Sequence, residues 1–263
     1  VLKKLPKSGG WMNTFKVTLA FLELALALKF LSVADLAYGW HILDREVFVS
    51  LWIVIFSLLG CYLLGLISFP HDDEDHRKTS VPRLFLAIIS LAFAMYMVPG
   101  LWGAPCKAVS AFAPPMTTQD FNLAKAEHIE PKAMDYELGM QMAEAAGKPV
   151  MIDFTGFGCV NCRKMEAAVW TDESVKSIIT DDYVLIQLFV DDKTPLAEPI
   201  EVVENGQPRK LRTIGDKWSY FQRTKFGSNT QPFYVLLDNN GQPLNSAYSY
   251  DEDIEKFLNW LKY

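Results

Sequence analysis

The sequence predicts an α-helical transmembrane segment of three spans, followed by an α/β domain with a mixed central sheet. Long apolar runs within residues 11–104 predict the first part, because a helix needs about 20 residues to cross a bilayer. Strand and helix patterns alternate after residue 116 and end in a strand pair, which predicts the second part. The net charge of −6 provides no basic surface for nucleic acid, so we expect no nucleic-acid partner.

We expect the spans at residues 15–36, 47–69 and 82–102, with membrane lipid around them. Glu23 and Lys29 lie in the first span and are costly in lipid, so they should face other helices or water. The alternative is a soluble protein with buried helices. Such runs in about 90 residues leave little sequence to cover them, which favours the membrane.

The Lys and Arg residues of the short flanks predict the orientation. They are Lys3, Lys4, Lys7 and Lys16 before the first span, Arg45 after it, and Arg77, Lys78 and Arg83 before the third. Because cytoplasmic loops carry the excess of these residues, the amino terminus and the second loop should be cytoplasmic. Everything after Trp102 should then lie outside, in a periplasm-like space.

The chain begins at Val1, without an initiator Met or a signal-peptide pattern, and we interpret it as part of a longer protein. We divide it into the end of a membrane domain at residues 1–104, a linker at 105–120 and a domain at 121–263. Pro114-Pro115 and the lack of helical periodicity indicate the linker.

The second half should contain four helices and four strands around one insert. We expect helices at 135–146, from the cysteines to about 169, at 172–180 and at 251–262, the last with Asp251 as its N-cap. We expect strands at 149–155, 183–190, 233–238 and 243–248. Residues 191–228 read as irregular and polar, with a hairpin turn at Asn205-Gly206.

The stretch "DFTGFGCVNCRKME", residues 153–166, places Cys159 and Cys162 after a strand and at the start of a helix. Unpaired N–H groups and the helix dipole favour a thiolate there, with Arg163 and Lys164 adding positive charge. Cys162 lies on the next turn, where its sulfur can attack a mixed disulfide formed by Cys159. This arrangement indicates a pair that cycles between dithiol and disulfide.

Two other interpretations of the pair are weaker. A zinc site needs four ligands, and His128, the histidine of this half, has no partner, so we expect no metal. A static structural disulfide is possible outside the cytoplasm, but so short a loop constrains the unfolded chain little.

Asp153 and Glu166 are candidate proton carriers for the cysteine pair. Asp153 lies among apolar strand residues, and Glu166 follows Cys162 by one helical turn. A carboxyl in an apolar setting has a raised pKa and could deprotonate Cys162. The alternatives are a hydrogen-bonded strand Asp153 and a solvated Glu166.

Strand "VMIDF", then "CVNC" at a helix start, then "TQPF" before "YVLLD" resembles the thioredoxin fold. The resemblance implies that Pro232 is the cis-proline opposite the cysteines and that Asp153 is the buried acid. Gln231 would offer backbone groups to a bound polypeptide. Gly158 stands where an aromatic residue is usual, beside the bound substrate.

Together with the apolar half, "LPKSGGWM" and "CVNCRKME" resemble the C-terminal part of the DsbD family of transmembrane thiol:disulfide interchange proteins. The resemblance implies a bacterial inner-membrane protein with Glu166 in its site. Electrons would pass from cytoplasmic thioredoxin through a membrane cysteine pair upstream of Val1 to this domain. They would continue to an N-terminal periplasmic domain and to periplasmic disulfide proteins. The only cofactor expected is the redox-active disulfide.

Two alternatives remain for the function: a membrane-anchored oxidase or isomerase, and a non-catalytic binding module with a structural disulfide. The remaining cysteines are poor substitutes for the membrane pair. We interpret Cys61 as a small buried apolar residue. Cys106 should be more exposed, and an odd reactive thiol is its alternative.

Overall fold

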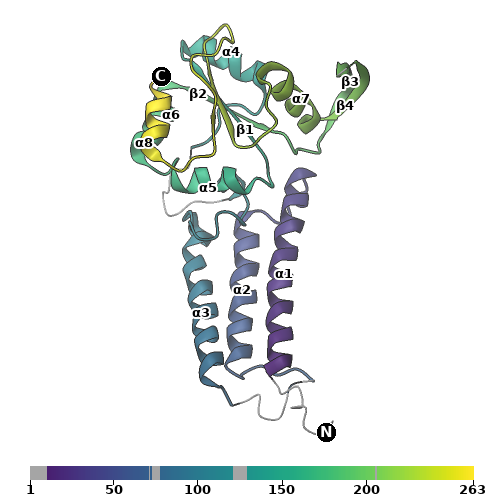
Figure 1. The fold of residues 1–263 in the computed structure, drawn as a ribbon, viewed down its shortest axis with the longest axis vertical. Helices are drawn as coiled ribbons and strands as arrows, with labels where there is room; N and C mark the ends of the chain where they lie inside the picture. Colours follow the sequence, from purple (N-terminus) through teal and green to yellow (C-terminus); the bar gives the residue numbers. More distant parts are fainter. Residues whose placement is uncertain (1–10, 71, 73–77, 121–128, 205) are drawn as a thin grey trace, which may run out of the picture.

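The computed structural model describes residues 11–70, 72, 78–120, 129–204 and 206–263. Long helices stand side by side, and an α/β half sits on one end of them (Figure 1). The predictions that concern Lys3, Lys4, Lys7, Arg77, His128 and Asn205 lie outside the described residues.

The helical half consists of α1 (Trp11–Ala37), α2 (Arg45–Leu63) and α3 (Val81–Met97), the last extended by the 3-10 helix η3 (Val98–Trp102). Among the described residues, three helices are long and apolar enough to cross a membrane. The second span was expected to reach residue 69, but α2 ends at Leu63. Gly65, with φ +76°, adopts the left-handed conformation that commonly follows a helix.

The three helices hold together through side chains buried between them. Trp52 of α2 donates its indole N–H to the carbonyl of Ala25 on α1, at 3.1 Å. Ser90 of α3 donates to the carbonyl of Phe56 on α2, at 2.6 Å. Glu23 is exposed on α1, whereas Lys29 is half-buried.

The α/β half contains a four-stranded mixed sheet with the strand order β2-β1-β5-β6. Its strands are β1 (Val150–Thr155), β2 (Val184–Phe189), β5 (Phe233–Leu237) and β6 (Tyr248–Ser249). β2 runs parallel to β1, while β5 runs antiparallel to it, which confirms the predicted fold class.

Helices cover both faces of this sheet (Figure 1). They are α4 (Tyr136–Ala146), α5 (Val160–Ala168), α6 (Glu173–Asp182), α7 (Ile214–Phe226) and α8 (Ile254–Leu261). The core against α4 and α7 contains Ile152 and Phe154, and the core against α5, α6 and α8 contains Met151. Because side chains alternate along a strand, Asp153 shares the face of Met151 and points toward α5.

The prediction of an irregular insert at 191–228 is wrong for most of its length. The chain forms an antiparallel hairpin of β3 (Pro195–Glu204) and β4 (Gln207–Thr213), and then α7. The hairpin strands are mostly exposed, so they lack the apolar alternation that reveals a strand. Thr213 and Asp216 form a capping box that starts α7.

The predicted strand at 243–248 is also wrong, since only Tyr248–Ser249 forms a strand, apart from one bridge at Pro243. Pro243 has no N–H for a ladder, and beside it the Leu244 N–H donates to the Leu236 carbonyl, at 2.9 Å. Asp251 is not the cap of α8. Asp253 is, with its carboxylate accepting from the Lys256 N–H at 3.1 Å.

The stretch at 105–120 folds back onto the helix ends and forms a layer that we call the platform, residues 105–119. It contains one short 3-10 helix, η4 (Met116–Thr118), and Gln119 donates to the carbonyls of Gly100 and Leu101, at 3.2 Å each. Cys106 is 7% exposed and packs in one core with Val49 of α2, so the expectation that it is exposed is wrong. Cys61 is half-buried.

Replacement of Phe257 by Ala should lower the free energy of unfolding of the α/β half by about 3–5 kcal/mol. Phe257 is fully buried, and its ring packs against Tyr234, Tyr248 and Trp260. Denaturant unfolding of the full chain, followed by near-ultraviolet circular dichroism, measures the change. The exposed Asn259→Ala on the same helix is the control, and an equal loss in both variants would contradict the prediction.

Candidate functional site

A tight turn carries the chain from the end of β1 to Cys159. The carboxylate of Asp191, which follows β2, accepts the backbone N–H groups of Phe157 and Gly158, at 2.9 Å each. The ring of Phe157 stacks on Phe189, with 4.3 Å between centroids. These contacts fix the turn against β2 and therefore fix the position of the first sulfur.

Cys159 and Cys162 are joined in a disulfide, with 5.3 Å between their Cα atoms. Cys159 is the N-cap of α5, and its sulfur accepts the backbone N–H of Cys162 at 3.1 Å. Cys159 is half-buried, whereas Cys162 is only 1% exposed. An incoming thiolate can therefore reach Cys159, and Cys162 is shielded as the leaving and resolving sulfur.

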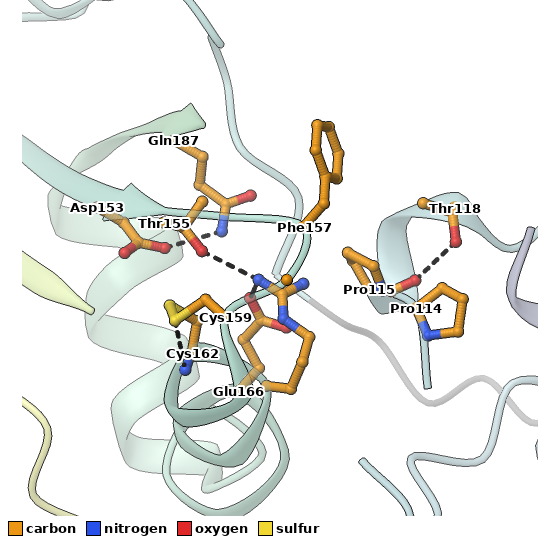
Figure 2. A network of polar contacts seen from close by, with 12 residues as sticks. Pro114, Pro115, Thr118, Asp153, Thr155, Phe157, Cys159, Cys162, Glu166 and Gln187 are labelled. Atoms are coloured by element: carbon orange, nitrogen blue, oxygen red, sulfur yellow. Dashed lines mark hydrogen bonds and ion pairs between the residues drawn. A yellow bond between two sulfur atoms is a disulfide. The ribbon is translucent and has the colours of Figure 1, made fainter. Parts of the chain in front are cut away.

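Asp153 lies on β1, between β2 and β5, and its carboxyl group is directed toward the cysteine pair (Figure 2). It is 1% exposed, and one carboxylate oxygen accepts the amide N–H of Gln187 at 3.0 Å. The other oxygen, Oδ1, has no hydrogen-bond partner in the part of the chain that the structure describes. Burial, and after it the nearby charge of Glu166, raises the pKa of Asp153 to about 7.

Glu166 forms an ion pair with Arg163, at 2.9 Å between Nη2 and Oε1. The same Nη2 atom donates to the hydroxyl of Thr155 at 3.0 Å, and Arg163 is only 4% exposed. Burial raises the pKa of Glu166, while the charge of Arg163 opposes that shift. Arg163, expected as positive charge beside the thiolate, is therefore a buried partner of the acid.

Asp153 and Glu166 thus form an acid pair beside the cysteines. Their charges repel, since the charge of Glu166 contributes to the raised pKa of Asp153. The carboxyl of Asp153 can consequently take up or release a proton near neutral pH, as a proton carrier for thiol chemistry must.

The Gln231–Pro232 peptide bond is cis. Phe154 pairs with Phe233, so Pro232 lies at the end of the sheet from which the cysteine turn leaves. The side chain of Gln231 points inward and donates to the Gln222 side chain at 2.9 Å. The roles of these residues and of Gly158 in substrate binding stay predictions.

The disulfide faces the helical half. A small crevice beside Cys159 is lined by Lys29, Ser32 and Val33 of α1 and by the platform. A Cβ atom on Gly158 would lie 3.2 Å from a methyl group of Val33, so a glycine permits this close approach. Lys193 donates its N–H to the carbonyl of Ala37 at 2.7 Å, which joins the two halves directly.

Sequence reasoning did not find Thr155, Gln187 or Asp191. Their roles depend on strand pairing, which brings β1 beside β2, and no local pattern marks them. The pairing of Arg163 with Glu166 did have a signal, because residues three apart on a helix are neighbours. The described residues contain no group of three His, Cys, Asp or Glu side chains that could hold a metal ion.

These features define a class of protein. A disulfide at a helix start after a buried strand, with a cis-proline at the same sheet end, is the site of thioredoxin-like thiol–disulfide oxidoreductases. A family model described as thioredoxin-like matches residues 130–238. The chain therefore contains a thioredoxin-like domain, joined in the described residues to three apolar helices.

The chain is similar to the C-terminal region of the thiol:disulfide interchange protein DsbD. It is 28% identical to DsbD of Pseudoalteromonas atlantica over 73% of this chain and 29% of the relative. It is 28% identical to DsbD of Salmonella typhi over 80% of this chain and 32% of the relative. The chain thus spans about a third of the length of these relatives. A solved structure, the DsbH oxidoreductase, is 16% identical, with a TM-score of 0.36 over 55% of this chain and 92% of that one.

Replacement of Asp153 by Asn should stabilise the oxidised protein relative to wild type, and more so at pH 8 than at pH 5. The folded protein holds the Asp153 proton up to a pKa of about 7, against an ordinary value of 3.8. The unfolded chain releases that proton earlier, so wild-type stability falls as the pH rises through this range and levels off above it. Across this pH range the free energy of unfolding of the wild-type protein should fall by at most about 4 kcal/mol.

Denaturant unfolding of both proteins at several pH values measures this difference. Asn keeps the acceptor for Gln187 without the charge, so packing should change little. If the free energies of unfolding of the two proteins differed by the same amount at every pH, the assignment of a raised pKa to Asp153 would be contradicted.

Proposed function

We propose that the protein passes reducing equivalents from the cytoplasmic side of a bacterial inner membrane to periplasmic disulfide proteins. The observation that carries this proposal is the half-buried Cys159, bonded to a buried Cys162, with the buried Asp153 and the mostly buried Glu166 beside the pair.

Reduction begins when a donor thiolate attacks Cys159. The Cys159–Cys162 bond breaks, a mixed disulfide forms, and Cys162 leaves as a thiolate that takes a proton. A second donor thiol then displaces Cys159. The donor dithiol becomes a disulfide, and the protein pair gains two electrons and the accompanying protons.

Delivery runs through the same steps in the opposite sense. The Cys159 thiolate attacks a client disulfide and forms a mixed disulfide with it. The acid pair, Asp153 and Glu166, accepts the proton of Cys162, whose thiolate then attacks Cys159 and releases the reduced client. Asp153 suits this role because its pKa of about 7 allows proton exchange near neutral pH.

The distribution of charge supports the proposed orientation. Lys16 lies in the first turns of α1, and Lys78 and Arg83 flank the start of α3. These two helix ends are remote from the α/β half (Figure 1). Such residues mark the cytoplasmic side of a membrane protein. The α/β half would then lie in the periplasm.

The partners follow from the likeness to DsbD, of which this chain spans only about a third. We propose that the donor is a cysteine pair in a membrane segment of the same longer protein, supplied by cytoplasmic thioredoxin. The acceptor would be an N-terminal periplasmic domain of that protein, which in turn reduces periplasmic disulfide proteins.

The full chain in detergent should show one reversible two-electron couple, measured by thiol labelling across a series of dithiol buffers. Cys159→Ser and Cys162→Ser should each abolish it, while Cys61→Ser and Cys106→Ser should retain it. A midpoint potential below about −180 mV is expected for a reductase, whereas an isomerase or an oxidase lies at or above that value. A pair that stays oxidised in excess dithiol would exclude exchange chemistry.

Cys162→Ser should accumulate mixed disulfides at Cys159, because the resolving sulfur is absent. Non-reducing gels of membranes from expressing cells detect these adducts. Cys159→Ser is the matched control and should trap nothing, since its remaining Cys162 is buried. Equal trapping by both variants, or by neither, would favour a binding module with a structural disulfide.

A further inference from the structure

Arg45 is a buried arginine at the start of α2, on the side of the α/β half. It is 2% exposed. Its guanidinium donates to the carbonyls of Pro114 at 2.5 Å and Pro105 at 3.1 Å, both in the platform. Its Nε atom has no hydrogen-bond partner among the described residues. Two neutral carbonyls therefore hold this charge in place without neutralising it.

Arg45 and the acid pair's Glu166 line one cavity between the two halves, with a volume of about 60 Å³. Pro114 and Met116 line it from the platform, and Arg163 and Gln187 line it from the α/β half. Figure 2 shows Pro114 and Pro115 on one side of Glu166, with Asp153 and Gln187 on the other. The cavity thus connects the charge of the helical half with the proton carriers of the redox site.

The negative charges of Asp153 and Glu166 are to be compared with the positive charges of Arg163 and Arg45 around this cavity. In the whole chain Asp153 is buried and Glu166, which lines the cavity, is 16% exposed, and Arg163 is the cation that the α/β half places beside Glu166. Arg45 adds the second cation only where the helical half is in contact. A buried charge without a counter-charge is costly, and the group changes its protonation state instead.

Other titratable groups face the cluster from each neighbouring element. Tyr234 of β5 lies near both acids, and burial holds its pKa well above its ordinary value, so it stays neutral. Cys106 of the platform lies near Arg45, and burial raises the pKa of its thiol. Lys29 of α1 and Arg163 line the adjoining crevice. Arg45 is the cation that the helical half brings to the cavity of Glu166.

We propose that Arg45 is a positioning residue for the exchange reaction: it supplies, from the membrane helices, the second positive charge that favours ionised Glu166 while the two halves are in contact. This inference deepens the proposed function, because an ionised carboxyl is the base that Cys162 requires. Burial raises the pKa of Glu166, and the charges of Arg163 and then Arg45 oppose that shift.

Infrared titration of the full, oxidised chain in lipid nanodiscs tests the proposal. Asp153→Asn and Glu166→Gln identify the bands of the two protonated carboxyl groups. Arg45→Gln, which keeps hydrogen-bond donors but has no charge, should move the titration midpoint of the pair upward by roughly half to one pH unit. Arg45→Lys should stay close to wild type. An unchanged midpoint in Arg45→Gln, or an equal shift in Arg45→Lys, would overturn the proposal.

A second pair of variants leaves Arg45 and its carbonyl contacts intact. Met116→Lys places a new cation in the same cavity and should move the midpoint downward, whereas Met116→Gln should not. This pair decides the question if Arg45→Gln fails to fold. If Met116→Lys left the titration midpoint unchanged, a role of Arg45 that depends on its charge would be contradicted.

The pH profile of disulfide reduction by dithiothreitol supplies a kinetic readout. Arg45→Gln should shift this profile in the wild-type background and leave it unchanged in the Glu166→Gln background, because the residue acts through the acid. An equal effect in both backgrounds would indicate a structural role. The infrared result does not require electron transfer, so failure of the proposed function and failure of this inference remain distinguishable.

Discussion

The placement of a buried Asp153 and a mostly buried Glu166 beside a disulfide is the constraint on which the rest of the site depends. Neither Asp153 nor Glu166 can be ionised there without compensation, and Gln187, Arg163 and Thr155 are arranged to provide part of it. This compensation stays incomplete, which leaves the pKa of Asp153 near neutrality. A fully satisfied carboxylate would be more stable and useless as a proton carrier.

The helical half does more than tether the redox domain to a surface. Asp35, buried at the end of α1, accepts the backbone N–H groups of Ile42 and Leu43, which orders the turn into α2. Arg45 then holds the platform through Pro105 and Pro114. These polar contacts at the helix ends shape a surface that fits the cysteine turn.

The sequence revealed whatever had a local pattern. Apolar runs predicted the long helices and the buried strands, and the spacing of Cys159 and Cys162 after a strand predicted the disulfide chemistry. The exposed β3–β4 hairpin was missed because its residues lack an apolar face. Gln187 and Arg45 were missed for another reason: their neighbours lie 34 residues away and in the other half of the chain, so only tertiary packing defines them.

Gly158 places the end of α1 directly against the reactive turn, and this proximity has a kinetic consequence. Val33 and Lys29 line the crevice beside Cys159, and we propose that an incoming polypeptide uses this same face of the turn. Occupation by the helices and occupation by a client are then mutually exclusive. The rate of electron transfer would then depend on how long the α/β half stays bound to the helical half, because the same face of Cys159 would serve the donor and the client in turn.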